Sequence, residues 1–350
     1  MTAYIIAARR TAVAPRRGAF ANIEAHDLAA PVLRACLEDV GLAPDRVDQV
    51  ILGNALSGGG NVARLAARLI EAGAAEAILA GGVESWSRAP LRAIRPRGAG
   101  EAPVFYDRPP FAPWPERDPD MIEAMAALAQ AENIGRIDQS AFAGASHAKA
   151  LAARERMKTE IVPLGGLDHD AFARALSLKL SMRAPILAGE GAGEGDCVID
   201  ATGVAVEADA AAVVLVVSER MAQRLGHGGL EFIGGLAIGS GPEQPAMAIV
   251  PAVRRLLGQT GLATADIDRI ELMEAFAAQA LANIAHLGLD PARINLGGGA
   301  LSRGHPVGAS GAILMVRLFH ELLARPEGAF GLAAIAAAGG LGSGLLLRRS

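Results

Sequence analysis

The sequence predicts an α/β fold of two domains built on an internal duplication. The chain has 350 residues, which is more than one ordinary hydrophobic core holds. Half of its residues are hydrophobic and a fifth are charged, a composition typical of globular proteins. A helix–loop–strand pattern also occurs twice in the chain, which indicates repeated structural units.

Charge and cysteine content exclude several classes of protein. A net charge of -4 and an isoelectric point near 6.0 give no general attraction to nucleic acid or to an anionic membrane. The only cysteines are Cys36 and Cys197, too few for a disulfide framework or a multi-cysteine metal site. No apolar run approaches the roughly 18 residues of a membrane span. The apolar run at 4–8 is short and its arginines follow it, so we expect a buried strand, not a signal peptide. A cytoplasmic protein is therefore expected.

The repeat joins residues 31–56 to residues 251–276 at a constant offset of 220. Each copy is typical of a helix that has a proline near its start and a glycine at its end. A short loop and an aspartate then precede a buried strand. The matched residues are Pro31 with Pro251, Gly41 with Gly261, and Asp48 with Asp268.

A second similarity joins Ala80-Gly-Gly to Ala338-Gly-Gly, at an offset of 258. This offset makes the first half 38 residues shorter between the two matches. In the second half this stretch contains a strand, the glycine turn 304–311 and a helix, whereas the first half has only a helix near 61–72. A strand, a turn and most of a helix need about thirty residues. We therefore predict that the first half lacks one strand–turn–helix element.

The remaining segments complete the predicted organisation. Residues 88–120 are rich in Pro and Arg and predict an irregular excursion. Helices are expected over 121–131 and 138–156, and a buried strand over 207–218. The predicted domains are an N-terminal domain (1–83 with 205–222), an inserted loop domain (84–204) and a C-terminal domain (223–350).

With these segments assigned, the chain resembles the thiolase family, acyl-CoA enzymes that make or break carbon–carbon bonds through an acyl-cysteine. The resemblance runs nearly end to end, and its most specific motif is Gly-His-Pro-Val-Gly-Ala-Ser-Gly at 304–311. It implies a layered α/β/α/β/α fold, CoA or acyl-CoA as substrate or ligand, and no covalently bound cofactor or metal. Further motifs that carry it lie at 5–11, 53–56, 61–64, 80–87, 118–121, 146–150 and 160–163.

The residues depart from the family where the chemistry lies. Thiolases carry their nucleophilic cysteine in the first-half segment that the repeat indicates is absent here. Cys36 falls in the repeated helix and is interpreted as a small core residue, and Cys197 as a surface-loop thiol. Neither has a neighbouring base in the sequence that would lower its pKa.

Two other family residues are also replaced. The family's Asn-Glu-Ala-Phe, whose Asn orders a catalytic water, is Met-Glu-Ala-Phe at 273–276. The second cysteine, which moves a proton in the condensation, corresponds to Ala336.

His305 is the catalytic residue that the resemblance keeps. In the family this histidine activates the cysteine and lines the oxyanion hole; a cap or a packing role is the alternative. The resemblance also implies substrate contacts for Phe276, Gly304 and Gly340. Arg92 and Arg95, with Arg97, could meet the phosphates of CoA, and a solvated arginine-rich loop is the equal alternative.

Other candidates have structural interpretations. His147 is expected to be a surface or packing residue, and Trp86 and Trp114 to pack under the loop domain. The glycine runs 58–60 and 297–299 lack the strand–turn–helix context of a dinucleotide site.

Three hypotheses follow. The first is an acyl-CoA acyltransferase, which requires a thiolate that the sequence does not offer. The second is a non-catalytic subunit that binds acyl-CoA, as a homodimer or with an active homologue. The third is an in-frame deletion product with exposed sheet edges. We expect an acyltransferase homologue that does not catalyse thiolysis, with no nucleic-acid or membrane partner.

Overall fold

The computed structural model describes residues 2–54, 62–191 and 196–350. Its main strands form two four-stranded groups, one from each half of the chain, which meet where β1 pairs with β11. The first group has the order β1 (Ala3–Thr11), β10 (Ala208–Ser218), β4 (Ala77–Glu84) and β3 (Gln49–Gly53). The second has the order β11 (Leu230–Gly239), β14 (Leu341–Arg349), β13 (Phe330–Ala337) and β12 (Ile267–Leu272). The two orders match, which confirms the duplication.

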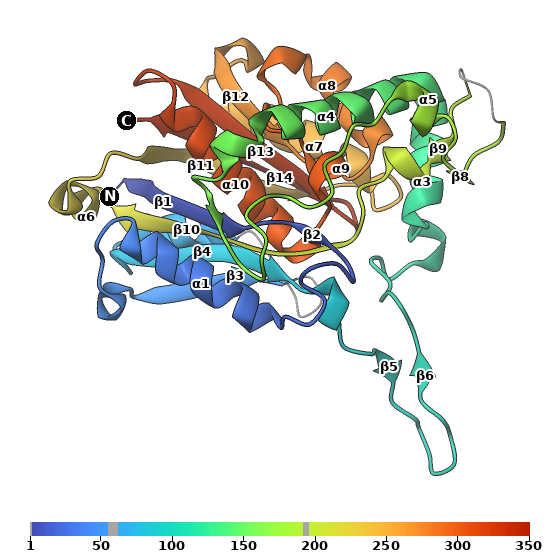
Figure 1. Ribbon diagram of the computed structural model, residues 1–350, viewed down its shortest axis with the longest axis horizontal. Coiled ribbons are helices and arrows are strands. Elements are labelled where there is room, and N and C mark those ends of the chain that lie inside the picture. Colours follow the sequence, from blue (N-terminus) through green and yellow to red (C-terminus); the bar gives the residue numbers. More distant parts are fainter. Residues whose placement is uncertain (1, 55–61, 192–195) are drawn as a thin grey trace.

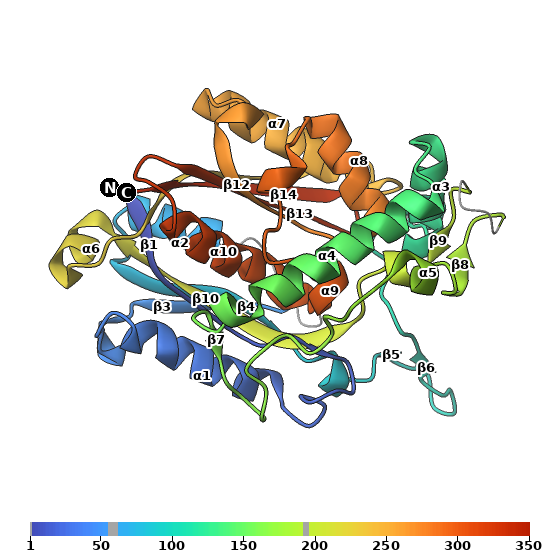
Figure 2. The same cartoon turned by 45° about the horizontal axis from the view of Figure 1, so that its top comes forward.

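Helices form three layers around the two strand groups (Figures 1 and 2). Helix α1 (Ala25–Glu38) covers the outer face of the first group. Helices α2 (Val62–Glu71) and α10 (Val307–Leu323) pack between the groups. Helices α7 (Ile249–Thr260) and α8 (Ala277–Leu287) lie over the outer side of the second group. This is the expected five-layer α/β/α/β/α fold.

The central strand β10 shows why the layers form. All eleven of its residues are buried, and successive side chains point to opposite faces of the sheet. Ala212 and Val214 pack toward α2 and α10, whereas Val213 and Leu215 pack toward α1. A strand covered on both faces is a continuous run of small and β-branched residues, as this one is.

The repeated unit forms the predicted elements with one difference. Gly41 and Gly261 follow the two helices with φ of 62° and 73°, the left-handed conformation that glycine adopts without strain. Pro251 lies in the first turn of α7, as expected. Pro31, however, lies inside α1, because residues 25–30 extend that helix upstream of the repeat.

The second similarity in the sequence is corrected by the strand register. Gly81 and Gly82 lie within β4, whereas Gly339 and Gly340 lie in a turn after β13, so the two Ala-Gly-Gly segments are not equivalent. Paired residues of β3 and β4 are 29 positions apart in the chain (Gln49 with Ile78). Those of β12 and β13 are 62 apart (Arg269 with Gly331), so the first half is shorter by 33 residues, not 38.

The structure shows what this difference removes. Eight residues connect β3 to α2, whereas 34 connect β12 to α10. The longer connection holds α8, a strand-like segment at Ile294 that bridges Ile270, and α9 (Ala300–Arg303). Helix α2 directly precedes β4, as α10 precedes β13, so it corresponds to the end of α10. The predicted loss is confirmed, with an outer helix in addition to the strand and the turn.

Residues 85–207 contain the insertion. An arm with the short pair β5 (Ala93–Ile94) and β6 (Val104–Phe105) extends away from the body in Figure 1. The expected helices are α3 (Met121–Ala131) and α4 (Arg136–Met157). The smaller elements of the chain are β2 (Ala14–Pro15), β7 (Ile161–Val162), α5 (Leu178–Ser181), β8 (Ile186–Ala188), β9 (Ile199–Asp200) and α6 (Glu219–Leu225). The domain boundaries given above stay a prediction. The glycine run 58–60 and the start of the 61–64 motif lie outside the described residues.

A buried ionic cluster joins the two halves through the insertion. The carboxylate of Glu160 bonds Arg10 of β1, with 2.7 Å between Nε and Oε1, and also bonds Arg317 of α10. Arg10 further pairs with Asp170. Burial alone would raise the pKa of Glu160, but Arg317 and Arg10 outweigh it and lower that pKa to about 2. The charges are therefore paired inside the protein.

The helices of the described ranges include none long and apolar enough to cross a bilayer.

Candidate active site

His305 lies in the glycine turn between α9 and α10. The preceding Gly304 has φ of 107°, a conformation that L side chains rarely adopt. A Cβ atom at this position would stand 2.8 Å from the Cβ of Ala208. Glycine is therefore required here for the turn to approach the start of β10.

Two hydrogen bonds hold His305 in place. Its backbone N–H donates to the Val206 carbonyl at 2.7 Å, and Nδ1 lies 2.7 Å from Oγ of Ser310. Burial lowers the pKa of His305 to about 4, so the imidazole is neutral at pH 7. A neutral imidazole has one donor and one acceptor nitrogen, and Ser310 occupies Nδ1. Nε2, which has no protein partner among the described residues, is left for a ligand.

Strand β4 of the first half supports the same turn. Oε2 of Glu84 accepts a hydrogen bond from the Gly308 N–H at 2.9 Å, at the N-terminus of α10. A carboxylate here also interacts favourably with the helix dipole. Gly82 allows the approach, because a Cβ on it would lie 2.0 Å from the Gly308 carbonyl oxygen. The first half thus positions the histidine of the second.

A short segment before β10 connects the His305 turn to the Phe276 turn. Val204 bridges Phe276, and the Ala205 N–H donates to the Ala275 carbonyl at 3.0 Å. Glu207 bridges His305. The motifs at 273–276 and 304–311 therefore lie on either side of residues 204–207.

The replaced family positions are apolar in the structure as well. Met273 is buried, and its N–H donates to the Ala334 carbonyl at 2.9 Å. Ala336 is partly buried on β13, opposite Gly342 of β14. Neither side chain can donate a hydrogen bond or transfer a proton.

The two cysteines lie in hydrophobic surroundings. Cys36 is fully buried between α1 and the sheet, with Sγ 3.5 Å from the Val213 carbonyl oxygen. Burial raises the pKa of this thiol to about 12, so it is not a thiolate at neutral pH. Cys197 was expected to be a surface thiol, but it is partly buried against the cluster that α3 and α8 share.

The remaining predicted site residues lie in different surroundings. Gly340 has φ of 81°, and a Cβ on it would lie 2.4 Å from the Ser240 carbonyl oxygen. Phe276 directly precedes α8 and packs against the cluster shared by α3 and α8. Arg92 and Arg95 lie on the exposed arm, where the Arg92 carbonyl accepts from the Tyr106 N–H at 3.1 Å. In Figure 1 this arm extends away from the body of the molecule, which contains α9 and α10. Substrate binding by these four residues stays a prediction.

Two interpretations of other residues are settled. His147 is buried and packs against Phe172, with 5.8 Å between ring centroids, so the packing role is confirmed. Trp114 is 50% exposed beneath the Arg117 guanidinium, so its predicted burial under the loop domain is wrong. Trp86 is partly buried.

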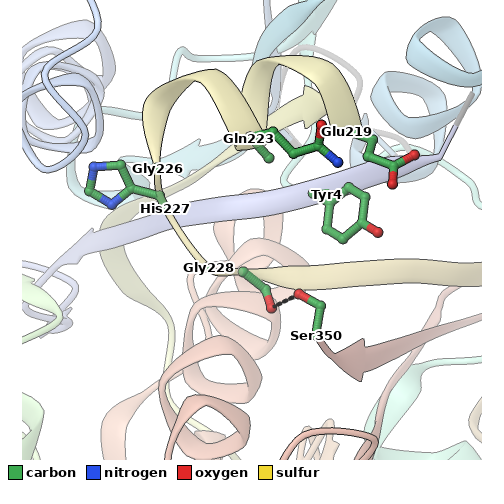
Figure 3. Close-up of a pocket in the computed structure, with 9 residues that line it drawn as sticks. Tyr4, Glu219, Gln223, Gly226, His227, Gly228 and Ser350 are labelled. Carbon is green, nitrogen blue, oxygen red and sulfur yellow. Dashed lines mark hydrogen bonds between the residues drawn. The ribbon is translucent and has the colours of Figure 1, made fainter.

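A hollow of about 290 Å³ opens where the two termini meet (Figure 3). Tyr4, Glu219 and His227 line it, and the Ser350 hydroxyl donates to the Gly229 carbonyl beside it. It lies near Ser218, whereas His305 lies at the opposite end of β10. The hollow is therefore separate from the histidine turn.

Sequence reasoning missed three parts of the site: Glu84, Ser310 and the segment 204–207. Glu84 and Ser310 stand inside the recognised motifs at 80–87 and 304–311. These motifs could have identified both residues as candidates. The contact between Glu84 and the turn before α10, however, joins residues 224 positions apart. No local pattern predicts such a pairing.

Comparison with known proteins identifies the family. The model of the thiolase C-terminal domain matches residues 232–349, and that of the thiolase N-terminal domain matches residues 3–67 and 56–220. YhfS of Bacillus subtilis, provisionally named an acetyl-CoA C-acetyltransferase, is 35% identical over 99% of both chains. VraB of Staphylococcus haemolyticus, named in the same way, is 33% identical over 99% of this chain and 98% of its own.

Solved structures agree with this fold. The Bacillus anthracis acetyl-CoA acetyltransferase superposes with a TM-score of 0.88 at 27% identity, over 100% of this chain and 99% of its own. Human mitochondrial 3-ketoacyl-CoA thiolase in complex with CoA has the same TM-score at 24% identity, over 100% and 98%.

The comparisons also locate the missing segment. The match to YhfS spans 380 positions, so at least 30 of them face gaps in this 350-residue chain. The N-terminal family model matches in two pieces that overlap at 56–67, between β3 and the first turns of α2. With its duplicated five-layer fold and its complete histidine turn, the chain belongs to the thiolase family.

Proposed function

We propose that this chain binds acyl-CoA at the His305 turn and does not carry out thiolysis through an acyl-cysteine. One observation carries the proposal: the only two thiols of the chain are Cys36, which is buried beneath α1, and Cys197, which packs against the cluster that α3 and α8 share. Covalent thioester chemistry needs an activated thiolate beside its base. The relatives named as acetyl-CoA acetyltransferases support acyl-CoA as the ligand class.

The retained parts of the site fit binding. His305 offers Nε2 of a neutral ring, and Ser310 and Glu84 hold the turn that carries it. A fixed hydrogen-bonding group of this kind can meet the polar end of a thioester without a covalent step. Because Met273 and Ala336 are apolar, proton transfer for condensation has no carrier at either position.

Two measurements on the full chain test this function. After incubation with acetyl-CoA, the intact mass should stay at that of the unmodified 35.8 kDa chain, without an acetyl adduct. Calorimetric titration should show binding of acetyl-CoA, weakened about fivefold by His305→Ala, because one hydrogen bond to a ligand contributes about 1 kcal/mol. His227→Ala, in the separate hollow, is the matched control and should bind as the wild type does.

Each outcome decides between hypotheses. A stable acetyl adduct would overturn the non-covalent proposal and restore the acyltransferase hypothesis. If neither CoA nor any acyl-CoA binds, the remaining hypothesis is a partner subunit that has no ligand of its own. A low, broad thermal transition would favour the deletion product.

Several finer statements remain predictions that depend on this function. They are a cytoplasmic location, a role in lipid metabolism, and assembly as a homodimer or with an active homologue. Arg92 and Arg95 would contribute to CoA binding only if the arm moved toward the body or reached a second chain.

A further inference from the structure

A buried carboxylate lies in the turn at 273–276. Glu274 is 2% exposed, although no step described so far uses it. Its Oε1 accepts a hydrogen bond from Nδ2 of Asn295 at 2.6 Å, and its Oε2 accepts one from Oγ of Ser146 at 2.7 Å. A carboxylate removed from water is costly unless such donors meet it. Two segments that are distant in the chain therefore supply the donors that this group needs.

Asn295 holds the carboxylate from the strand-like segment beside β12. The residue has φ of 46°, a left-handed conformation that is uncommon outside glycine. Its Oδ1 accepts from the Leu272 N–H at 2.8 Å, and its Nδ2 also donates to the Leu272 carbonyl at 2.9 Å. Backbone strain of this kind persists only where the surrounding contacts fix it. Asn295 thus joins the last residue of β12 to Glu274.

Ser146 of α4 brings the insertion into the same network. Its Oγ donates to Glu274 and accepts from the Gly299 N–H at 2.9 Å. Gly299 is the N-cap of α9, the helix that leads directly to Gly304 and His305. A path of hydrogen bonds therefore runs from the insertion to the start of the helix before the histidine.

The glycines before α9 allow this close approach. A Cβ atom on Gly299 would lie 2.0 Å from Cδ of Glu274. A Cβ atom on Gly298 would lie 2.6 Å from the Ser146 carbonyl oxygen. The run at 297–299, which lacks the context of a dinucleotide site, thus lets α4 and the carboxylate reach the backbone here.

We propose that Glu274 is a positioning residue, which couples helix α4 of the insertion to the His305 turn through Ser146 and Asn295. It fixes the start of α9, and with it the direction of Nε2 of His305, without touching the ligand. Packing alone does not need a carboxylate here, since an apolar side chain of similar length would avoid the cost of burying a charge. The expected effect on the ligand rests on the proposed acyl-CoA binding, whereas the effect on His305 does not.

The imidazole of His305 reports on this coupling without any ligand. Burial lowers its pKa to about 4, so its NMR signals should stay constant between about pH 5.5 and 7.5 in the wild type. Ser146→Ala removes the hydroxyl between Glu274 and Gly299. Water should then reach the loosened turn, and the pKa of His305 should rise toward its ordinary value of about 6.5. The signal, assigned with His305→Ala, should therefore move with pH over this range.

Ser218→Ala is a closely matched control. Oγ of Ser218 also donates to a carboxylate, Oε2 of Glu76 at 3.0 Å, and accepts from a backbone N–H, that of Met221 at 3.2 Å. This buried serine lies at the other end of β10 from the His305 turn. Both serine variants should lose similar stability, but Ser218→Ala should leave the titration of His305 as it is in the wild type.

Two changes at Glu274 separate its hydrogen bonds from its packing. Glu274→Gln keeps an oxygen that can accept from Asn295 and an amide that can donate to Ser146, whereas Glu274→Met, of similar length, offers neither. His305 should titrate as in the wild type in the first variant, and with a raised pKa in the second. Acetyl-CoA should bind about threefold more weakly to Ser146→Ala and Glu274→Met, because the imidazole stays but is less well held.

The outcomes separate this coupling from the proposed function. A His305 titration that stays unchanged in Ser146→Ala, a mild substitution that does not depend on the folding of Glu274→Met, would overturn the coupling. A wild type that does not bind acetyl-CoA would contradict the proposed function alone, because the titration of His305 still tests the positioning.

Discussion

The two halves of the molecule share a strand order and a capping detail, yet only one of them carries a histidine turn. Asp48 accepts a hydrogen bond from the first residue of β4, Ala77, and Asp268 does the same for Phe330 of β13. Between these matched points the first half is 33 residues shorter. Both halves keep four main strands, one outer helix (α1 or α7) and one central helix (α2 or α10).

The difference teaches which elements this fold can lose. The first half keeps β1, β10, β4 and the central helix α2, which form the shared core with α10. Among the described residues it lacks mates for α8, α9 and the Ile294 segment, which lie at the edge of the second strand group. This difference lies at the edge of the fold and leaves the core between the halves intact.

Substitution of the buried ionic cluster that joins the two halves should cause the largest loss of stability. Glu160→Gln leaves the buried Arg10 and Arg317 without a carboxylate between them, and should cost about 3–5 kcal/mol in the free energy of unfolding by urea. Glu207→Gln, in an exposed pair with Arg16, should cost less than about 1 kcal/mol. Equal losses of stability for the two variants would mean that the buried ionic cluster does not stabilise the contact between the halves.

Acid should weaken the same junction. The pKa of Glu160 is lowered to about 2 from 4.5, so its stabilising effect is present above pH 4.5 and is lost as the pH falls toward 2. The loss should reach about 3 kcal/mol, at 1.36 kcal/mol per pKa unit. Unfolding curves between pH 5 and 2 check this, and Glu160→Gln should lack this part of the pH dependence.

Repeat mates at the sheet edges should respond unequally. Ile270→Ala should cost about 3 kcal/mol because it leaves a cavity, whereas Val50→Ala, at a half-exposed site, should cost less than about 1 kcal/mol. Urea unfolding measures both losses of stability. A large cost of Val50→Ala would show that this edge is already covered within the chain.

Substitutions at the contact between β4 and the His305 turn should give the next largest loss of stability. Gly82→Ala would place a Cβ 2.0 Å from the Gly308 carbonyl oxygen, between two backbones, and should cost about 2 kcal/mol. Gly258→Ala in α7, where a Cβ meets nothing within 4 Å, should stabilise by about 0.5–1 kcal/mol. Thermal unfolding measures the stability of both variants. If Gly82→Ala has the stability of the wild type, β4 and the His305 turn do not pack as closely as the structure shows.

Substituting the two replaced family positions of the second half should not produce thiolysis. Met273→Asn with Ala336→Cys introduces the two residues that the resemblance to the family implies, but the proposal above attributes the absence of thiolysis to a missing nucleophile in the first half. Thiolysis assayed with acetoacetyl-CoA should stay at the background rate. Measurable turnover would contradict the proposal that the chain lacks a nucleophile for thiolysis.

Local patterns predicted much of this protein. The helix, the glycine stop and the strand of each repeat could be read from residues 31–56 and 251–276, because periodicity and turn residues act over short distances. The motif at 304–311 likewise identified His305. The register was harder: Gly81 and Gly339 look alike in sequence, but one is in a strand and the other in a turn.

The sequence by itself determined the duplication, the short first half, the number of thiols and the resemblance to the family. Only the tertiary structure decided that Glu84 supports the His305 turn, that Glu160 joins Arg10 to Arg317, and that Val50 is exposed where Ile270 is covered. The physical reason is that these features depend on contacts between segments more than a hundred positions apart, or on a neighbour that is absent. Their strength comes from burial and close approach, which no local pattern encodes.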